Sequence, residues 1–126
     1  MISTLTRSFL ATTLAACGLT LTAGAAGHAP TRVADTNLTL RAVGSIAYDK
    51  QSLQARAGRV KIVMKNASPL KHDVAIRGKG VKAKGKVVTT GRTSTAVARL
   101  KSGRYVFYCS VPGHEAAGMK GALTVR

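Results

Sequence analysis

The chain has 126 residues, which leaves room for one compact domain and none for a second catalytic domain. Twenty Lys and Arg residues stand against four Asp and Glu residues, so the formal net charge is +16 and the composition favours acidic partners. Aromatic residues make up only 4%, too few for base stacking, so nucleic acid is not the expected partner.

Residues 1–27 have the pattern of an export signal. Arg7 precedes an apolar run rich in Leu and Ala, and no acidic residue occurs before Asp35. Threonines interrupt this run, which leaves it too short for a permanent transmembrane helix. The sequence therefore predicts an exported protein that resides in the periplasm, outside the cell or on the cell envelope.

Two ways of processing this signal stay open. Residues 23–25 (AGA) fit an ordinary signal-peptidase site, whereas residues 14–17 (LAAC) resemble a lipoprotein signal, in which Cys17 would carry a lipid anchor. In either case the folded domain contains a single functional thiol, Cys109. A lone thiol cannot build a disulfide scaffold, and in an oxidising compartment a bound metal is the simplest reason to keep it.

A series of short strand patterns follows the signal. Residues 28–37 read as a polar linker, and the folded domain is predicted to span residues 38–126. The clearest period-two run is 59–65, whereas the Gly- and Lys-rich stretch 77–86 is predicted to be an exposed mobile loop. Strands at this spacing, without a long helical pattern, indicate an antiparallel sandwich or barrel. The strands are predicted at 38–43, 53–57, 59–65, 73–76, 87–89, 94–100, 104–109 and 122–125.

A thiol, an imidazole and a thioether occur near the end of the chain in the order C-x4-H-x4-M: Cys109, His114 and Met119. The Pro-Gly pair between Cys109 and His114 is typical of a turn that folds the imidazole back toward the thiol. His72 lies just after the turn that ends the 59–65 strand. Each of these residues alone is more often a core or surface residue. Together, two imidazoles, a thiolate and a weak thioether are the ligands of an electron-transfer copper site.

The redox chemistry of copper explains why these residue types occur together. A copper ion that alternates between two oxidation states needs ligands that move little. Thiolate and thioether suit Cu(I), and imidazole accommodates both states. We expect Cys109 to bind one copper ion as a thiolate and Met119 to tune its potential from a long axial distance.

The same residues resemble the cupredoxin family, which includes azurin, auracyanin and plastocyanin-type proteins. Residues 108–121 (YCSVPGHEAAGMKG) are similar to the family's copper loop, and residues 66–73 (NASPLKHD) to its first-ligand segment. The likeness extends over residues 38–126 and implies an all-β fold, a Greek-key antiparallel β-sandwich with copper near one end. Asp73 stands where the family often has Asn, and it is expected to hydrogen-bond the Ser110 hydroxyl and lower the copper potential.

The resemblance implies a type 1 (blue) copper protein, not an enzyme, that shuttles single electrons between redox protein partners. A monomer is expected, with acidic partners that dock around His114 and are attracted by Lys71 and Lys120. The main alternative is an exported copper chaperone or storage protein, which the thiolate of Cys109 disfavours. A metal-free basic domain that binds the cell envelope is a further alternative. A copper oxidase would need several more histidines than the three in the chain.

Overall fold

The computed structural model describes residues 32–126, together with Gly24 and Gly27. The chain divides into two units, Met1–Pro30 and Thr31–Arg126, and the second unit is the folded domain. The predicted export signal at 1–27, including Cys17, and the first residues of the predicted linker lie outside the described ranges apart from the two glycines. Among the residues described, no helix has the length and apolarity needed to cross a membrane.

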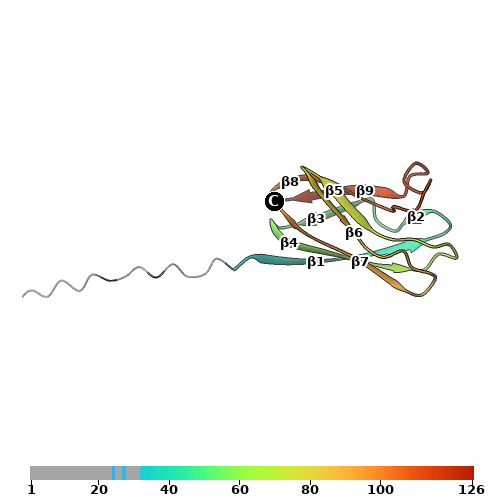
Figure 1. Ribbon diagram of the computed structural model, residues 1–126, viewed down its shortest axis with the longest axis horizontal. Helices are drawn as coiled ribbons and strands as arrows, with labels where there is room; N and C mark the ends of the chain where they lie inside the picture. The colour runs from blue at the N-terminus through green and yellow to red at the C-terminus, as the bar shows by residue number, and fades with distance from the viewer. Residues whose placement is uncertain (1–23, 25–26, 28–31) are drawn as a thin grey trace, which may run out of the picture. The chain divides into compact units, whose positions relative to one another are not determined.

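In the described part of the chain, nine strands form two sheets that pack face to face (Figure 1). The four-stranded sheet has the order β2-β1-β4-β7 and the five-stranded sheet the order β3-β9-β8-β5-β6. An all-β sandwich was the fold class predicted from the sequence, and it is confirmed. The strands are β1 Ala34–Val43, β2 Ala47–Tyr48, β3 Ser52–Ala55, β4 Gly58–Asn66, β5 Ala75–Gly78, β6 Val81–Lys84, β7 Thr93–Leu100, β8 Gly103–Tyr108 and β9 Lys120–Val125.

The core lies between the two sheets because apolar and polar residues alternate along the strands. In β4, Val60, Ile62 and Met64 are fully buried, whereas the residues between them face outward. Phe107 of β8 and Leu123 of β9 meet them from the opposite sheet and are also fully buried. The two hydrophobic faces thus bury one another, as in other two-layer β domains.

Most neighbouring strands are antiparallel, but β1 pairs with β4 and β3 pairs with β9 in parallel. Parallel neighbours cannot be joined by a tight hairpin, so the chain must make another element between them. Here β3, which lies in the other sheet, comes between β1 and β4 in the sequence. These crossovers tie the two layers together.

The two largest differences from the sequence prediction lie in β1 and in the segment 77–86. Strand β1 begins at Ala34, so residues 34–37 of the predicted linker belong to the sheet; the exposed polar Asp35 and Asn37 conceal this strand in the sequence. The predicted mobile loop at 77–86 is wrong for most of its length, because β5 and β6 form a hairpin there. Its turn, at Lys79 and Gly80, has positive φ angles of 49° and 76°, as in the tight turns that favour hairpins.

Two loops at one end of the sandwich carry the residues predicted to bind metal. One loop follows β4 and leads to β5; the other, red in Figure 1, connects β8 to β9 at the end opposite the C-terminus. The first contains His72, and the second contains Cys109 and His114. Residues 42 positions apart in sequence therefore meet at this end.

Candidate metal centre

Three side chains bring their donor atoms together between these loops. Nδ1 of His72 lies 3.1 Å from Nδ1 of His114. The Sγ atom of Cys109 lies 3.8 Å from the first of these nitrogens and 3.6 Å from the second. The three atoms form a compact triangle of two imidazole nitrogens and one sulfur, the only group of metal-binding type found among the described residues.

The triangle has the right size for one transition-metal ion. A point about 2 Å from all three donor atoms exists within a triangle of these sides, close to ordinary metal–nitrogen and metal–sulfur bond lengths. Two imidazole nitrogens that face one another this closely repel unless a proton or a cation lies between them. The donor set and its spacing therefore fit a single copper ion.

Hydrogen bonding fixes which nitrogen of His72 is free to bind. The Ser68 hydroxyl donates its only proton to the Ser45 carbonyl at 3.1 Å, so it can only accept from His72 Nε2, 2.9 Å away. Nε2 therefore carries the ring proton, and the Nδ1 lone pair points at Cys109 and His114. Burial, with a contribution from the charge on His114, lowers the pKa of His72 and favours the neutral ring that binds metal.

The loop that carries His72 is fastened from within by Asn66. This fully buried side chain donates to the carbonyls of Leu70 and Val88 at 2.7 and 2.9 Å, and accepts from the amide of Ser68 at 2.9 Å. The backbone of His72 also exchanges two hydrogen bonds with Val88, at 3.1 and 2.8 Å. Residues 87–89, predicted as a strand, make only this isolated bridge. Buried polar groups are thereby satisfied and the ligand is held in place.

Cys109 directly follows β8 and is fully buried and free of any disulfide. Burial raises the pKa of its thiol, and backbone hydrogen bonds from Asp73 and Val111 to the sulfur lower it in part. A bound cation would convert this thiol into the thiolate. The site without metal thus keeps a protonated sulfur, and metal binding releases its proton.

The loop between β8 and β9 is closed by backbone hydrogen bonds around Met119. The Met119 carbonyl accepts from the Cys109 amide, and the Met119 amide donates to the His114 carbonyl, both at 3.0 Å. Met119, the fourth member of the predicted ligand set, is fully buried. Its backbone therefore joins the two ligands of this loop directly.

Asp73, next to His72, is also fully buried beside the site. Its carboxylate accepts hydrogen bonds from the amide of Ser110, at 2.6 Å, and from the Ser110 hydroxyl, as predicted from the sequence. Its carbonyl accepts the Tyr48 hydroxyl proton at 2.6 Å. Asp73 thus links the His72 loop to the residue that follows Cys109, and Lys84 lies 4.0 Å from its carboxylate.

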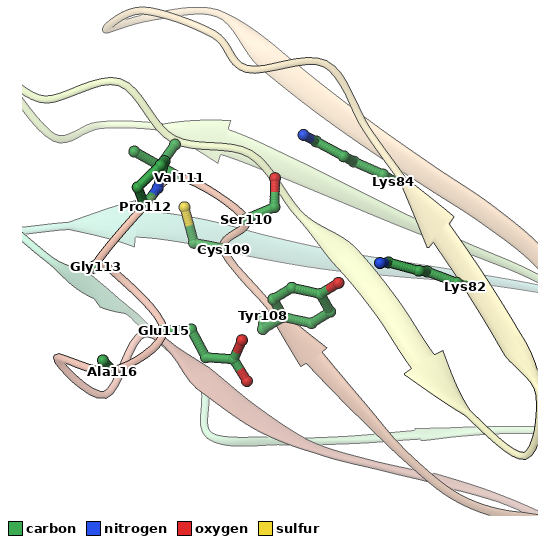
Figure 2. Close-up of a pocket in the computed structure, with 10 residues that line it drawn as sticks. All are labelled: Lys82, Lys84, Tyr108, Cys109, Ser110, Val111, Pro112, Gly113, Glu115 and Ala116. Carbon is green, nitrogen blue, oxygen red and sulfur yellow. The ribbon is translucent and has the colours of Figure 1, made fainter.

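An open pocket with a volume of about 490 Å³ lies beside the copper loop (Figure 2). Tyr108, the residue before Cys109, and Glu115 both line this pocket. The Arg77 guanidinium lies 4.4 Å from the centre of the Tyr108 ring and also pairs with Glu115. This ion pair raises the pKa of Arg77 and lowers that of Glu115. The pocket is lined by Lys82, Lys84, Tyr108, Cys109, Ser110, Val111, Pro112, Gly113, Glu115 and Ala116.

The contributions of Ser68, Tyr48 and Arg77 are not predicted from the sequence. Each of these residues acts through a contact between segments far apart in the sequence or through a loop turn. No pattern of residue types predicts such contacts. Ser68 lies four residues before His72, and the path of the loop between them brings the two side chains together.

The sequence profile of the family described as copper binding proteins, plastocyanin/azurin family, matches residues 35–126. The chain belongs to this family. The predicted membership of the cupredoxins is confirmed, and the donor cluster with Met119 is a type 1 copper site that fits one copper ion. No curated protein sequence matches this cupredoxin significantly.

Solved structures of auracyanins resemble this cupredoxin over most of their length. Auracyanin B has a TM-score of 0.65 and 22% identity, and the match covers 75% of this chain and 90% of that one. Dithionite-reduced auracyanin from Roseiflexus castenholzii has a TM-score of 0.64 and 25% identity, covering 72% and 97%. Auracyanin A from Chloroflexus aurantiacus, described as a "blue" copper protein, has a TM-score of 0.62 and 18% identity, covering 74% and 100%.

Proposed function

We propose that this blue copper protein carries single electrons between redox partners outside the cytoplasm, on one copper held by His72, Cys109, His114 and Met119. The observation that carries the proposal is the convergence of two imidazole Nδ1 atoms and one sulfur, all within 4.8 Å of one another. A bound copper ion supplies a one-electron couple, Cu(II)/Cu(I). The residues around it supply a ligand set that need not rearrange.

The rigid support of the ligands favours electron transfer over metal delivery. His72 and Cys109 are fully buried, and His72 is held by Ser68 and by the Asn66 network. A chaperone must release its ion to a partner, which calls for accessible and movable ligands. A buried thiolate in a hydrogen-bonded frame instead retains the ion while its oxidation state changes. Copper delivery or storage is therefore the second candidate, and catalysis on a substrate is not proposed.

His114 is the ligand through which the electron enters and leaves the copper site. Unlike His72, it is only partly buried, and it belongs to a loop whose exposed residues are small and uncharged: Pro112, Gly113, Ala116, Ala117 and Gly118. Such a surface lets a partner approach the imidazole edge closely and leave quickly. Lys71 and Lys120, both exposed, flank ligand positions and would attract acidic partners over longer distances.

The location outside the cytoplasm rests on the export-signal pattern of residues 1–27, with either cleavage after a small-residue site or lipidation at Cys17. A thiol kept free in an oxidising compartment agrees with metal occupation of Cys109.

The test is electron exchange by the copper-loaded full chain. Stopped-flow oxidation of the reduced protein by anionic hexacyanoferrate(III) should be fast, complete and reversible, with one electron per copper. It should slow as salt rises. Lys71→Gln/Lys120→Gln should weaken this salt dependence, whereas Arg56→Gln/Arg126→Gln, on exposed residues next to each other at the other end of the sandwich, should not. Copper that binds but is lost on each reduction would favour the delivery function instead.

A further inference from the structure

The outer face of the four-stranded sheet is rich in cations. Alternation along β1, β4 and β7 points every second side chain away from the core. Five of the outward residues are basic and one, Asp35, is acidic. We call this surface the basic face; its cations are Arg41, Arg59, Lys61, Lys65 and Arg99.

The cations of the basic face lie directly beside one another. Arg59 is in register with Arg99 across β4 and β7, and Arg41 is in register with Lys65 across β1 and β4. Like charges in register on one face of a sheet repel. The ion pairs found among residues 32–126 are Arg77–Glu115 and Lys84–Asp73, and neither involves the basic face. Asp35 is in register with Arg59, and the Asp49 carboxylate accepts from the Arg41 amide, so two carboxylates offset part of the charge. Five cations against these two acids leave the basic face with a net positive charge.

The residues between the cations favour a flat, non-specific contact. The middle of the face is formed by Val63 and Val97, with Thr39 and Thr95 beside them, and Val97 is 41% exposed. No outward residue of these three strands is aromatic. Tight protein interfaces are usually centred on aromatic or other large anchors, and single-stranded nucleic acid needs stacking side chains. A membrane of anionic phospholipids needs only an array of cations at its surface.

We propose that the basic face binds the surface of membranes that contain anionic phospholipids. In this orientation the four-stranded sheet lies against the headgroups. The chain enters the sheet at Ala34, the first residue of β1, so the segment that carries the predicted export signal is joined to this same sheet. The copper loop lies beyond the ends of the strands and belongs to the other sheet (Figure 1), which leaves the edge of His114 accessible to partners. The proposal does not depend on the electron-transfer function.

The test compares two variants that each lose three positive charges. Arg59→Gln/Lys65→Gln/Arg99→Gln removes cations from the basic face. Lys82→Gln/Lys86→Gln/Arg104→Gln removes three exposed cations elsewhere and serves as the matched control. All chains keep the same N-terminal segment, so any lipid affinity of that segment cancels in the comparison. Thermal unfolding without copper verifies that each variant is folded.

Binding is measured by co-sedimentation with phosphatidylcholine vesicles in which about a third of the lipid is phosphatidylglycerol. We expect wild-type binding that weakens with salt, a loss of roughly a hundredfold in the basic-face variant, and a much smaller loss in the control. Equal losses in the two variants would show attraction by net charge alone and overturn the proposal. Binding to duplex DNA or to an acidic protein that exceeds vesicle binding, with the same dependence on the basic face, would overturn the choice of lipid.

Discussion

The two loops that form the copper site differ in how they are held. The loop between β4 and β5 buries His72 completely and fixes it through Ser68, Asn66 and the bridge to Val88. The loop between β8 and β9 is held mainly by its own backbone hydrogen bonds, and its tip is exposed. One loop thus fixes the geometry of the site, and the other leaves the edge of His114 partly exposed. Under the proposed function, the first loop holds the metal and the second is where partners exchange its electron.

The largest effect that would test this comparison comes from Asn66→Ala. The change leaves the Leu70 carbonyl without its side-chain donor and the buried Ser68 amide without its acceptor, whereas the Val88 carbonyl keeps the amide of His72. At about 1–3 kcal/mol for each group left unpaired, we expect a loss of roughly 3 kcal/mol in the free energy of unfolding from the two groups together. Urea unfolding measures it. Asn37→Ala, an exposed asparagine on β1, should change stability by less than about 0.5 kcal/mol. Similar effects of the two would mean that the buried loop is not held as described.

Ser68→Ala tests the fixed orientation of His72. The change also takes the acceptor from the Leu70 amide and a donor from the Ser45 carbonyl, so thermal unfolding verifies that the variant is folded. Without the hydroxyl, Nε2 loses its acceptor and Nδ1 is no longer the preferred unprotonated nitrogen. Copper affinity should fall about 10- to 100-fold, as expected when a metal ligand loses its hydrogen-bonding partner. Competition with a chelator measures this change. The exposed Ser102 offers a control, since Ser102→Ala should leave affinity unchanged; an unaltered affinity in Ser68→Ala itself would remove this serine from the account.

The metal-free protein should be most stable between about pH 6.5 and pH 9, the ordinary pKa values of histidine and cysteine. The pKa of His72 is lowered by burial, so below pH 6.5 the unfolded chain binds a proton that the folded chain resists, and stability falls with pH. The pKa of Cys109 is raised by burial, so above pH 9 the unfolded chain loses a proton that the folded chain keeps, and stability falls as pH rises. Burial also raises the pKa of Tyr48, which acts in the same direction at higher pH.

Urea unfolding of the metal-free chain across this pH range gives the measurement. His72 alone should contribute a slope of at most about 1.4 kcal/mol per pH unit on the acid side, the value for one proton. His72→Gln should reduce that slope, and His28→Gln, in the predicted linker, should not. If both variants leave the pH dependence of the unfolding free energy below pH 6.5 unchanged, the result would contradict a buried, neutral His72.

Asp73→Asn is expected to have the smallest effect and concerns the contact between the two loops. Asn can still accept the Ser110 amide, and the Ser110 hydroxyl can turn to accept from its amide group, so the fold should persist. Losing a buried negative charge near the site disfavours the more positive oxidised copper, and the midpoint potential should rise by roughly 60 mV, a tenfold change in the redox equilibrium. Asp49→Asn, at an exposed carboxylate, should shift it far less. A potential that stays constant in Asp73→Asn would exclude this carboxylate from tuning the site.

The sequence carries the fold class and the donor set because both depend on local patterns. Period-two runs such as 59–65 identify strands, and C-x4-H-x4-M places three chemically matched side chains on one loop. Strand β1 escaped full detection because its first residues are polar on an exposed face, and the β5–β6 hairpin because its lysines and glycines are also typical of loops. The parallel pairing of β1 with β4 and the contact of Ser68 with His72 depend on tertiary packing, which periodicity does not encode.

The most direct test of the copper site is the visible absorption and electron paramagnetic resonance of the full chain loaded with Cu(II). Wild type and Cys17→Ser should show an intense visible band and the resonance of a copper–thiolate centre, and Cys109→Ser should lose both. A colourless wild-type protein with copper bound, or a band that survives in Cys109→Ser, would contradict a site built around this sulfur.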